Sequence, residues 1–187
     1  MKTKFLVISV LGMALAACEG NAPQPVEKAD KAPAAQGADT AAPMASARFV
    51  ELGVQGDGRE PLLMVQGQAV TSSTGPVEAG ALTGVAVEIG NFAGQSTGQV
   101  GVRVCQREEC TNAAVDLAGS TDNAYLVVQF PKALNVVGGQ GVEVNVARLT
   151  ESTPFALWTY PSATSMTLAD GTVVNRSLKV GLYYEGK

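Results

Sequence analysis

The chain has 187 residues, with 13 lysines and arginines against 17 aspartates and glutamates and no histidine, so its formal net charge is −4. Because it shows no histidine, nucleophile motif or metal motif, we expect a protein that is not an enzyme and needs no cofactor. The acidic balance and the lack of basic clusters argue against nucleic acid as a partner.

The first 17 residues have the three parts of an export signal. Lys2 and Lys4 give a basic start, an apolar core covers 5–17, and small residues close it before Cys18. Thirteen helical residues reach about 20 Å, short of the ~30 Å hydrocarbon layer. The segment 1–17 is therefore predicted to be a signal peptide and not a membrane anchor.

The tetrapeptide Leu15-Ala16-Ala17-Cys18 resembles the lipobox of bacterial lipoproteins. The resemblance implies diacylation of the Cys18 sulfur, cleavage before Cys18 and acylation of the freed amine, and several acyl chains hold a protein firmly at a membrane. Glu19 stands where inner-membrane lipoproteins usually have aspartate, which implies the outer membrane, with its periplasmic or surface face left open. The alternative is an ordinary secretory signal with a chance cysteine beside the cleavage site.

The mature chain would have 170 residues and a net charge of −6, enough for one domain with a real core. Its first part, residues 18–47, begins with Cys18, and 19–47 holds 10 alanines and 4 prolines among 29 residues, without an aromatic residue. Such a stretch buries too little apolar surface to offset the entropy of ordering it. We predict a disordered tether, since its prolines interrupt the alternative of an alanine-rich helix.

From residue 48 to residue 187 the pattern changes to period two, which is strand spacing. The valines within 100–104 and within 142–146 alternate with glycine or polar residues. We expect an all-β fold, an antiparallel β-sandwich of about 8–9 strands. Its topology is expected to be jelly-roll-like, because the Cys–Trp–Cys spacing of an immunoglobulin core is missing. The candidate strands lie near 48–54, 62–70, 82–90, 98–105, 113–117, 123–130, 141–149, 154–160 and 177–184.

Cys105 and Cys110 are the two cysteines left once Cys18 is acylated. Four intervening residues fit a hairpin whose flanking positions lie opposite each other, at a separation that suits a disulfide. We predict a structural disulfide that contributes about 2 kcal/mol by closing so small a loop. A redox pair would favour two intervening residues at a helix start, and zinc would need more ligands.

Four short segments stand out within the span 85–161: Val-Glu-Ile-Gly-Asn-Phe (87–92), Gly-Gln-Val-Gly-Val-Arg-Val-Cys (98–105), Leu-Ala-Gly-Ser-Thr-Asp-Asn-Ala-Tyr-Leu (117–126) and Phe-Ala-Leu-Trp-Thr-Tyr-Pro (155–161). They resemble a jelly-roll-like module found outside the cytoplasmic membrane on bacterial polysaccharide-assembly proteins and some lipoproteins. The resemblance implies a sandwich fold in a glycan-rich setting, without defined binding residues.

Trp158 and Tyr160 share one face of a predicted strand, and Phe155 and Leu157 share the other, so one of the two faces is core. The sequence favours a core position for Trp158, the only tryptophan. If the Trp158 face is outside, it forms an aromatic platform for sugar, joined by Tyr183 or Tyr184.

Other polar groups are expected in turns. The acidic residues there lack the alternating oxygen ligands of a calcium loop, so we interpret them as solvated turn residues. The segment 138–141, Gly-Gly-Gln-Gly, precedes a strand and is predicted to be a turn and not a phosphate cradle. The acidic residues are Glu108, Glu109, Asp116, Asp122 and Asp170.

Three functions remain open. The first is a lipid-anchored envelope protein whose non-catalytic module binds envelope glycan. The second is a structural or assembly lipoprotein that docks on another envelope protein. The third, least favoured, is a glycan hydrolase with unrecognised carboxylates.

Overall fold

The structure is a computed structural model that describes residues 46–54, 56–150 and 153–186. The predicted signal peptide, Cys18 and almost all of the predicted tether lie outside these residues. In the described part, no helix is long and apolar enough to cross a membrane.

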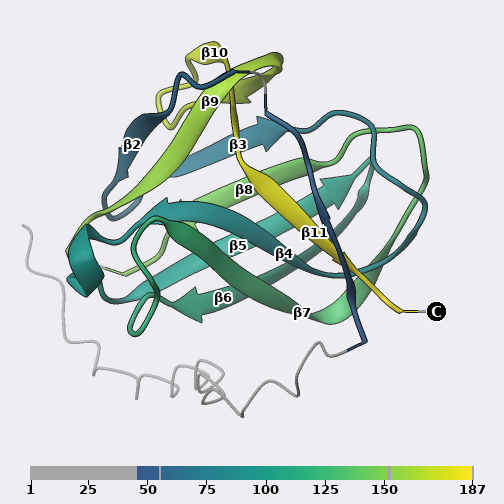
Figure 1. Cartoon of the computed structure of the whole chain (residues 1–187), viewed down its shortest axis with the longest axis horizontal. Helices are drawn as coiled ribbons and strands as arrows, with labels where there is room; N and C mark the ends of the chain where they lie inside the picture. Colours follow the sequence, from purple (N-terminus) through teal and green to yellow (C-terminus); the bar gives the residue numbers. More distant parts are fainter. Residues whose placement is uncertain (1–45, 55, 151–152, 187) are drawn as a thin grey trace, which may run out of the picture. The chain divides into compact units, whose positions relative to one another are not determined.

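The described chain folds into antiparallel β-strands and one short 3-10 turn, so the predicted all-β class is confirmed (Figure 1). Eleven strands are found, against the 8–9 predicted. The elements are β1 (Arg48–Glu51), β2 (Glu60–Met64), β3 (Ala69–Ser73), β4 (Gly80–Gly90), η1 (Phe92–Gly94), β5 (Gln99–Gln106), β6 (Glu109–Asp116), β7 (Ala124–Val136), β8 (Glu143–Arg148), β9 (Phe155–Thr167), β10 (Val173–Leu178) and β11 (Val180–Tyr184).

The strands make two layers that β9 joins. The first layer runs β1-β11-β4, with β7 on the other side of β4, and the second runs β3-β8-β5-β6. Strands β11, β4 and β7 lie in front of β8, β5 and β6 in Figure 1. The first half of β9 pairs with β2 and with the end of β4, its last residues pair with β3, and β10 pairs with both halves. One strand therefore belongs to both layers.

Period-two sequence produces the core between the layers. The valines of β5 and β8 that alternate with polar residues point inward, and Val102 pairs with Val146 across the two strands. Val85, Val87 and Ile89 of β4 face them from the first layer with at most 1% of their surface exposed. Burial of such aliphatic side chains is the main stabilising contribution to a sandwich of this kind.

Three strand predictions need correction. The predicted strand 62–70 is two strands, because the chain turns at Gly67, whose φ of +78° suits glycine. The predicted strand 177–184 is divided at Lys179, where β10 ends and β11 begins. The second half of β9 and most of β10 were not predicted, because the small polar residues 162–165 carry no apolar alternation. The segment 138–141 forms the predicted turn.

Candidate functional site

The outward side of the first layer carries the candidate site. Along β4, Val87 and Ile89 point into the core, so Glu88 between them points outward. Glu88 pairs with Tyr125 on β7. On the other side of β4, Gly84 pairs with Tyr183 of β11, which in turn pairs with Phe49 of the edge strand β1. Period-two alternation therefore brings one acidic and three aromatic side chains to one face.

Phe49, Tyr125 and Tyr183 form the aromatic end of this face. The ring of Phe49 lies 4.8 Å from that of Tyr183 and 5.8 Å from that of Tyr125, in tilted and edge-on arrangements that aromatic pairs prefer. Phe49 is 39% exposed. A Cβ on Gly181 would lie 2.1 Å from the Phe49 ring, so this glycine makes the space in which the ring lies over β11.

Arg59, Glu88, Trp158 and Tyr160 form the polar end. The Arg59 guanidinium lies 3.6 Å from the centroid of the Trp158 ring, and its Nη2 donates a 2.7 Å hydrogen bond to Asn123 Oδ1. The same nitrogen lies 3.6 Å from Glu88 Oε1, while the Tyr160 hydroxyl donates a 2.6 Å hydrogen bond to Glu88 Oε2. Glu88 is therefore a nearly buried carboxylate that accepts a hydrogen bond on Oε2 and has a cation near Oε1.

Glu51 and Lys179 link the two ends. Lys179 Nζ lies 3.6 Å from Glu51 Oε1 and 5.5 Å from the centroid of the Tyr125 ring. With Arg59 and Glu88, they give the face two cations and two carboxylates. The face is therefore polar and close to electrically neutral.

Burial changes the acidity of the phenols on this face. Desolvation, followed by the hydrogen bond to Glu88, raises the pKa of Tyr160 to about 12. Desolvation also raises the pKa of Tyr125 well above its usual range, with the Glu51 carboxylate second. The Tyr125 hydroxyl has no hydrogen-bond partner within geometric limits in the described chain, so we attribute its shift mainly to burial. Both phenols stay protonated donors at neutral pH.

Two supporting contacts fix Arg59. Arg176 Nη2 donates hydrogen bonds to Gly58 O at 2.6 Å and to Thr159 O at 2.7 Å, which ties the residue before Arg59 to β9. Asp122 Oδ1 accepts a 2.6 Å hydrogen bond from the Asn91 backbone, and the next residue, Asn123, holds the Arg59 side chain. Arg59 is thus positioned from both sides.

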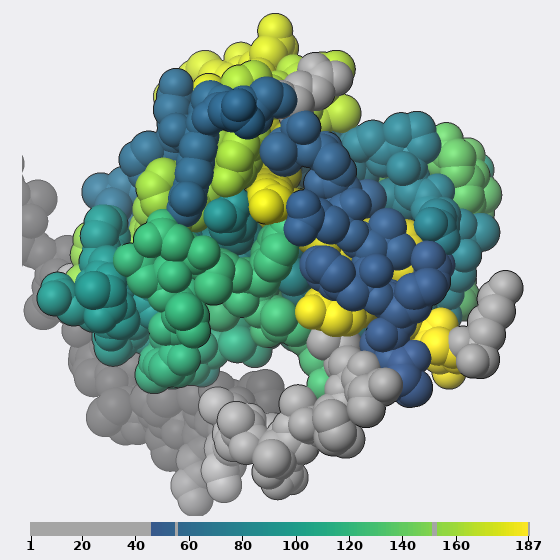
Figure 2. Space-filling view, viewed as in Figure 1, coloured from purple at the N-terminus to yellow at the C-terminus, as the bar shows by residue number. Residues whose placement is uncertain are grey.

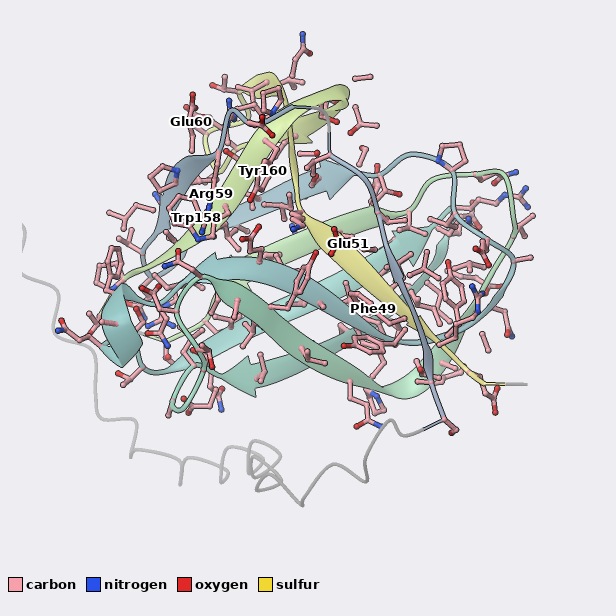
Figure 3. All side chains as sticks on the ribbon, in the orientation of Figure 1. Phe49, Glu51, Arg59, Glu60, Trp158 and Tyr160 are labelled. Carbon is pink, nitrogen blue, oxygen red and sulfur yellow. A yellow bond between two sulfur atoms is a disulfide. The ribbon has the colours of Figure 1, made fainter. Side chains whose placement is uncertain are left out.

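The site is open on the face in view. Figure 2 shows the surface hollowed between the dark blue atoms of β1 and the green atoms of β7 and of the loop before it. Figure 3 places Arg59, Trp158 and Tyr160 together near β2 and β9, with Glu51 and Phe49 farther along β1. The two ends therefore belong to one continuous surface.

The structure settles which face of β9 is core. Phe155 and Leu157 are fully buried among the core side chains, so the favoured expectation that Trp158 is a core residue is wrong. Trp158 and Tyr160 lie on the outer side, but Arg59 covers one side of the Trp158 ring. Gly90 lies against the indole, because its Cβ would be 3.3 Å from Trp158 Nε1.

Of the other two aromatic candidates, Tyr183 belongs to the outer face and Tyr184 does not. Tyr184 is 2% exposed and packs in the core, so it is not available to a surface ligand. Sequence reasoning missed Phe49, Arg59, Glu88 and Tyr125. The signal for Glu88 was present, because a charged residue interrupts the apolar run 85–89.

Asp116, Asp122 and Asp170 behave as turn residues. Asp116 accepts a 2.7 Å hydrogen bond from the backbone of Ala118, and Asp170 accepts a 2.8 Å bond from that of Thr172. Backbone donors of this kind lower the pKa values of Asp122 and Asp170. Glu108 lies in the β5–β6 turn and Glu109 begins β6. Within 46–54, 56–150 and 153–186, no group of three metal-ligating side chains occurs.

Cys105 and Cys110 lie directly opposite each other in the β5–β6 hairpin, with their sulfurs 2.15 Å apart and their Cα atoms at 4.1 Å. The predicted disulfide is compatible with this geometry. The hairpin is tighter than expected, because the strands continue one residue past each cysteine.

The fold and its outer face together describe an all-β sandwich domain with an aromatic and charged outer face. The chain matches no protein family model and no curated protein.

Proposed function

We propose that this domain binds glycan on the outer face of the β1-β11-β4-β7 layer, as the non-catalytic module of a lipid-anchored envelope protein. One observation carries the proposal: Phe49, Tyr183 and Tyr125 form a contiguous row of rings on the outside of a sheet, beside fixed charged groups. Soluble domains seldom expose contiguous apolar surface without a use.

The aromatic end of the face suits the apolar C–H faces of a sugar ring, and the polar end suits its hydroxyl groups. The C–H faces of a sugar ring stack on aromatic rings, and Phe49 and Tyr183 supply such rings at the open end. Sugar hydroxyls both donate and accept hydrogen bonds, and Glu51, Lys179 and Arg59 offer both kinds of partner. Because Arg59 covers Trp158, stacking is assigned to Phe49 and Tyr183 and polar recognition to the Trp158 end.

The electrical balance of the face favours a neutral glycan. Lys179 is paired with Glu51 and Arg59 lies beside Glu88, so a charged sugar would have to compete with an existing ion pair. Neutral hydroxyls can bond to these groups without separating them. Among the described residues, the charged groups named on this face lie in pairs of opposite sign, which gives a charged polymer no free charge to bind.

The test is a binding titration of the full chain against a panel of envelope polysaccharides. Trp158 is the only tryptophan, so its fluorescence reports ligand at the polar end directly. Phe49→Ala should lower affinity about tenfold, because loss of a stacked ring is worth roughly 1 kcal/mol or slightly more. The matched control is Phe92→Ala, another exposed phenylalanine, at the turn after β4, and it should bind like the parent. Equal affinity of the Phe49→Ala variant, or no binding by the parent, would rule out the proposal.

A further inference from the structure

The β5–β6 hairpin ends the second layer and carries its disulfide on the surface. Cys110 is exposed and Cys105 is partly exposed. The two strands pair in register from Gln99↔Asp116 to Gln106↔Glu109, with Cys105↔Cys110 as one pair among many. The hairpin therefore does not depend on the disulfide for its pairing, and both sulfurs remain accessible.

A cation lies against one of the two sulfurs. Arg103 precedes Cys105 by two residues, so both side chains stand on the same face of β5. Arg103 Nη2 donates to Cys110 Sγ over 3.0 Å. In the described chain Arg103 forms no ion pair with a carboxylate, so its charge is not already neutralised. A guanidinium in this position stabilises negative charge that develops on the Cys110 sulfur.

The other sulfur lies beside a surface groove. A groove of about 340 Å³ is lined by Cys105, Arg107 and Glu143 among other residues, but not by Cys110. The two cysteines are thus unlike each other: Cys105 lines the groove, whereas Cys110, the more exposed of the two, has the cation. This asymmetry gives the disulfide a defined direction of opening.

We propose that Cys105–Cys110 is a thiol-exchange site whose reaction partner is a dithiol reductant. A thiolate of the dithiol attacks Cys105 Sγ, the bond between the two protein sulfurs breaks, and Cys110 leaves as a thiolate beside Arg103. The second thiol of the partner then attacks the mixed disulfide, releases Cys105 and closes a disulfide in the partner. The dithiol is oxidised, the protein pair is reduced, and the two protons lost by the dithiol end on the two cysteines.

The experiment uses the full chain with Cys18→Ser, in which Cys105 and Cys110 are the only cysteines. Glutathione is the probe, because acid quenching at early times traps its mixed disulfide for peptide mass spectrometry, before the freed thiol or a second glutathione attacks that disulfide. We expect glutathione on Cys105. Glutathione mainly on Cys110, or no opening of the disulfide while the domain is folded, would overturn the proposal.

The role of Arg103 is tested by the rate at which the mixed disulfide with glutathione forms. Arg103→Gln should slow formation of the mixed disulfide several-fold, because the leaving thiolate loses its neighbouring cation. Arg48→Gln is the matched control: Arg48 is also an exposed strand arginine, but it lies on β1, in the other layer, and its Nη2 pairs with Glu78 Oε2 at 2.6 Å. It should react at the parent rate. Equal rates for the two variants would contradict the assigned role of Arg103.

Circular dichroism after reduction separates exchange from a structural role. Because the hairpin pairing is extensive, the reduced protein should keep the spectrum of the oxidised one. Loss of the β spectrum on reduction would show that the disulfide is needed for the fold and would refute the exchange site.

Discussion

Glu88 is the residue on which the polar end of the outer face depends. Its side chain is 11% exposed, and its two oxygens face Tyr160 and Arg59, so one neutral donor and one cation hold a partly desolvated carboxylate. Leaving such a carboxylate without donors costs more free energy than one ordinary hydrogen bond. The arrangement also explains why Tyr160 resists ionisation: its phenolate would lie beside an existing negative charge.

The raised pKa of Tyr160 predicts that stability falls at alkaline pH. Its pKa is about 12 in the fold and about 10 in an unfolded chain, so its contribution is complete below pH ~10 and is lost as pH rises through about 12. Tyr125 acts in the same direction. Denaturant unfolding over this range should show a shallower decline for Tyr160→Phe, although that variant is less stable at neutral pH because it lacks the bond to Glu88. An unchanged slope would contradict the assignment.

Glycines in two strands give the outer face its shape. Gly181 in β11 and Gly90 at the end of β4 leave space for the rings of Phe49 and Trp158, which lie over the sheet and do not stand away from it.

Two edge strands carry residues that oppose pairing with a strand of another protein. The edge strand β2 contains Pro61, which has no amide proton, and β7 contains Pro131 beside Lys132. Proline and lysine on edges oppose pairing with another chain, so these edges give no support to docking by strand addition.

Gly181→Ala should displace the Phe49 ring and reduce glycan affinity about as much as Phe49→Ala does. The added Cβ would lie 2.1 Å from the ring, which must move, whereas the backbone of Gly181 does not require glycine. Gly101→Ala in β5, in the other layer, is the control, since the atoms nearest to its Cβ belong to the flexible side chain of Leu149, at 3.1–3.3 Å. Thermal denaturation should find both variants folded. Unchanged affinity of Gly181→Ala would show that the ring position is not needed.

The elements differ in how far the sequence could predict them. Strands β5 and β8 follow from valine alternation, because one buried face imposes period two on the sequence. The second half of β9 has no such signal, because the small residues 162–165 show no apolar alternation and its pairs with β10 and β3 come only at Met166 and Thr167. Arg59, just before β2, and Trp158, in β9, are 99 positions apart in the sequence, so no local sequence pattern predicts their contact. Which face of β9 is core also depends on its pairing with β4.

The whole molecule is expected to combine this domain with a lipid anchor and a tether. Binding of anionic lipid by charge is not expected, because the mature chain would carry a net charge of −6 without basic clusters. We therefore expect acyl chains on Cys18 to attach the protein to the membrane. The length of the tether 19–47 then sets how far from the membrane the outer face can bind a ligand. At about 5–6 Å times the square root of 29 residues, a flexible tether would reach roughly 30 Å. A weak glycan site benefits from being held near its ligand, because a tether raises the local concentration.

Cys18→Ser should release the protein from membranes, since the acyl chains that replace electrostatic attraction would have no sulfur to join. Cell fractionation should find the parent in the membrane pellet and the Cys18→Ser variant in the soluble fraction. Radiolabelled palmitate should label the parent and not the Cys18→Ser variant. The double variant Cys105→Ser/Cys110→Ser is the control, because it removes two cysteines of the folded domain and should remain in the pellet with its label. Membrane retention of the Cys18→Ser protein would show that a different segment binds the membrane. In that case that segment, and not acyl chains on Cys18, would hold the outer face of the domain near the membrane.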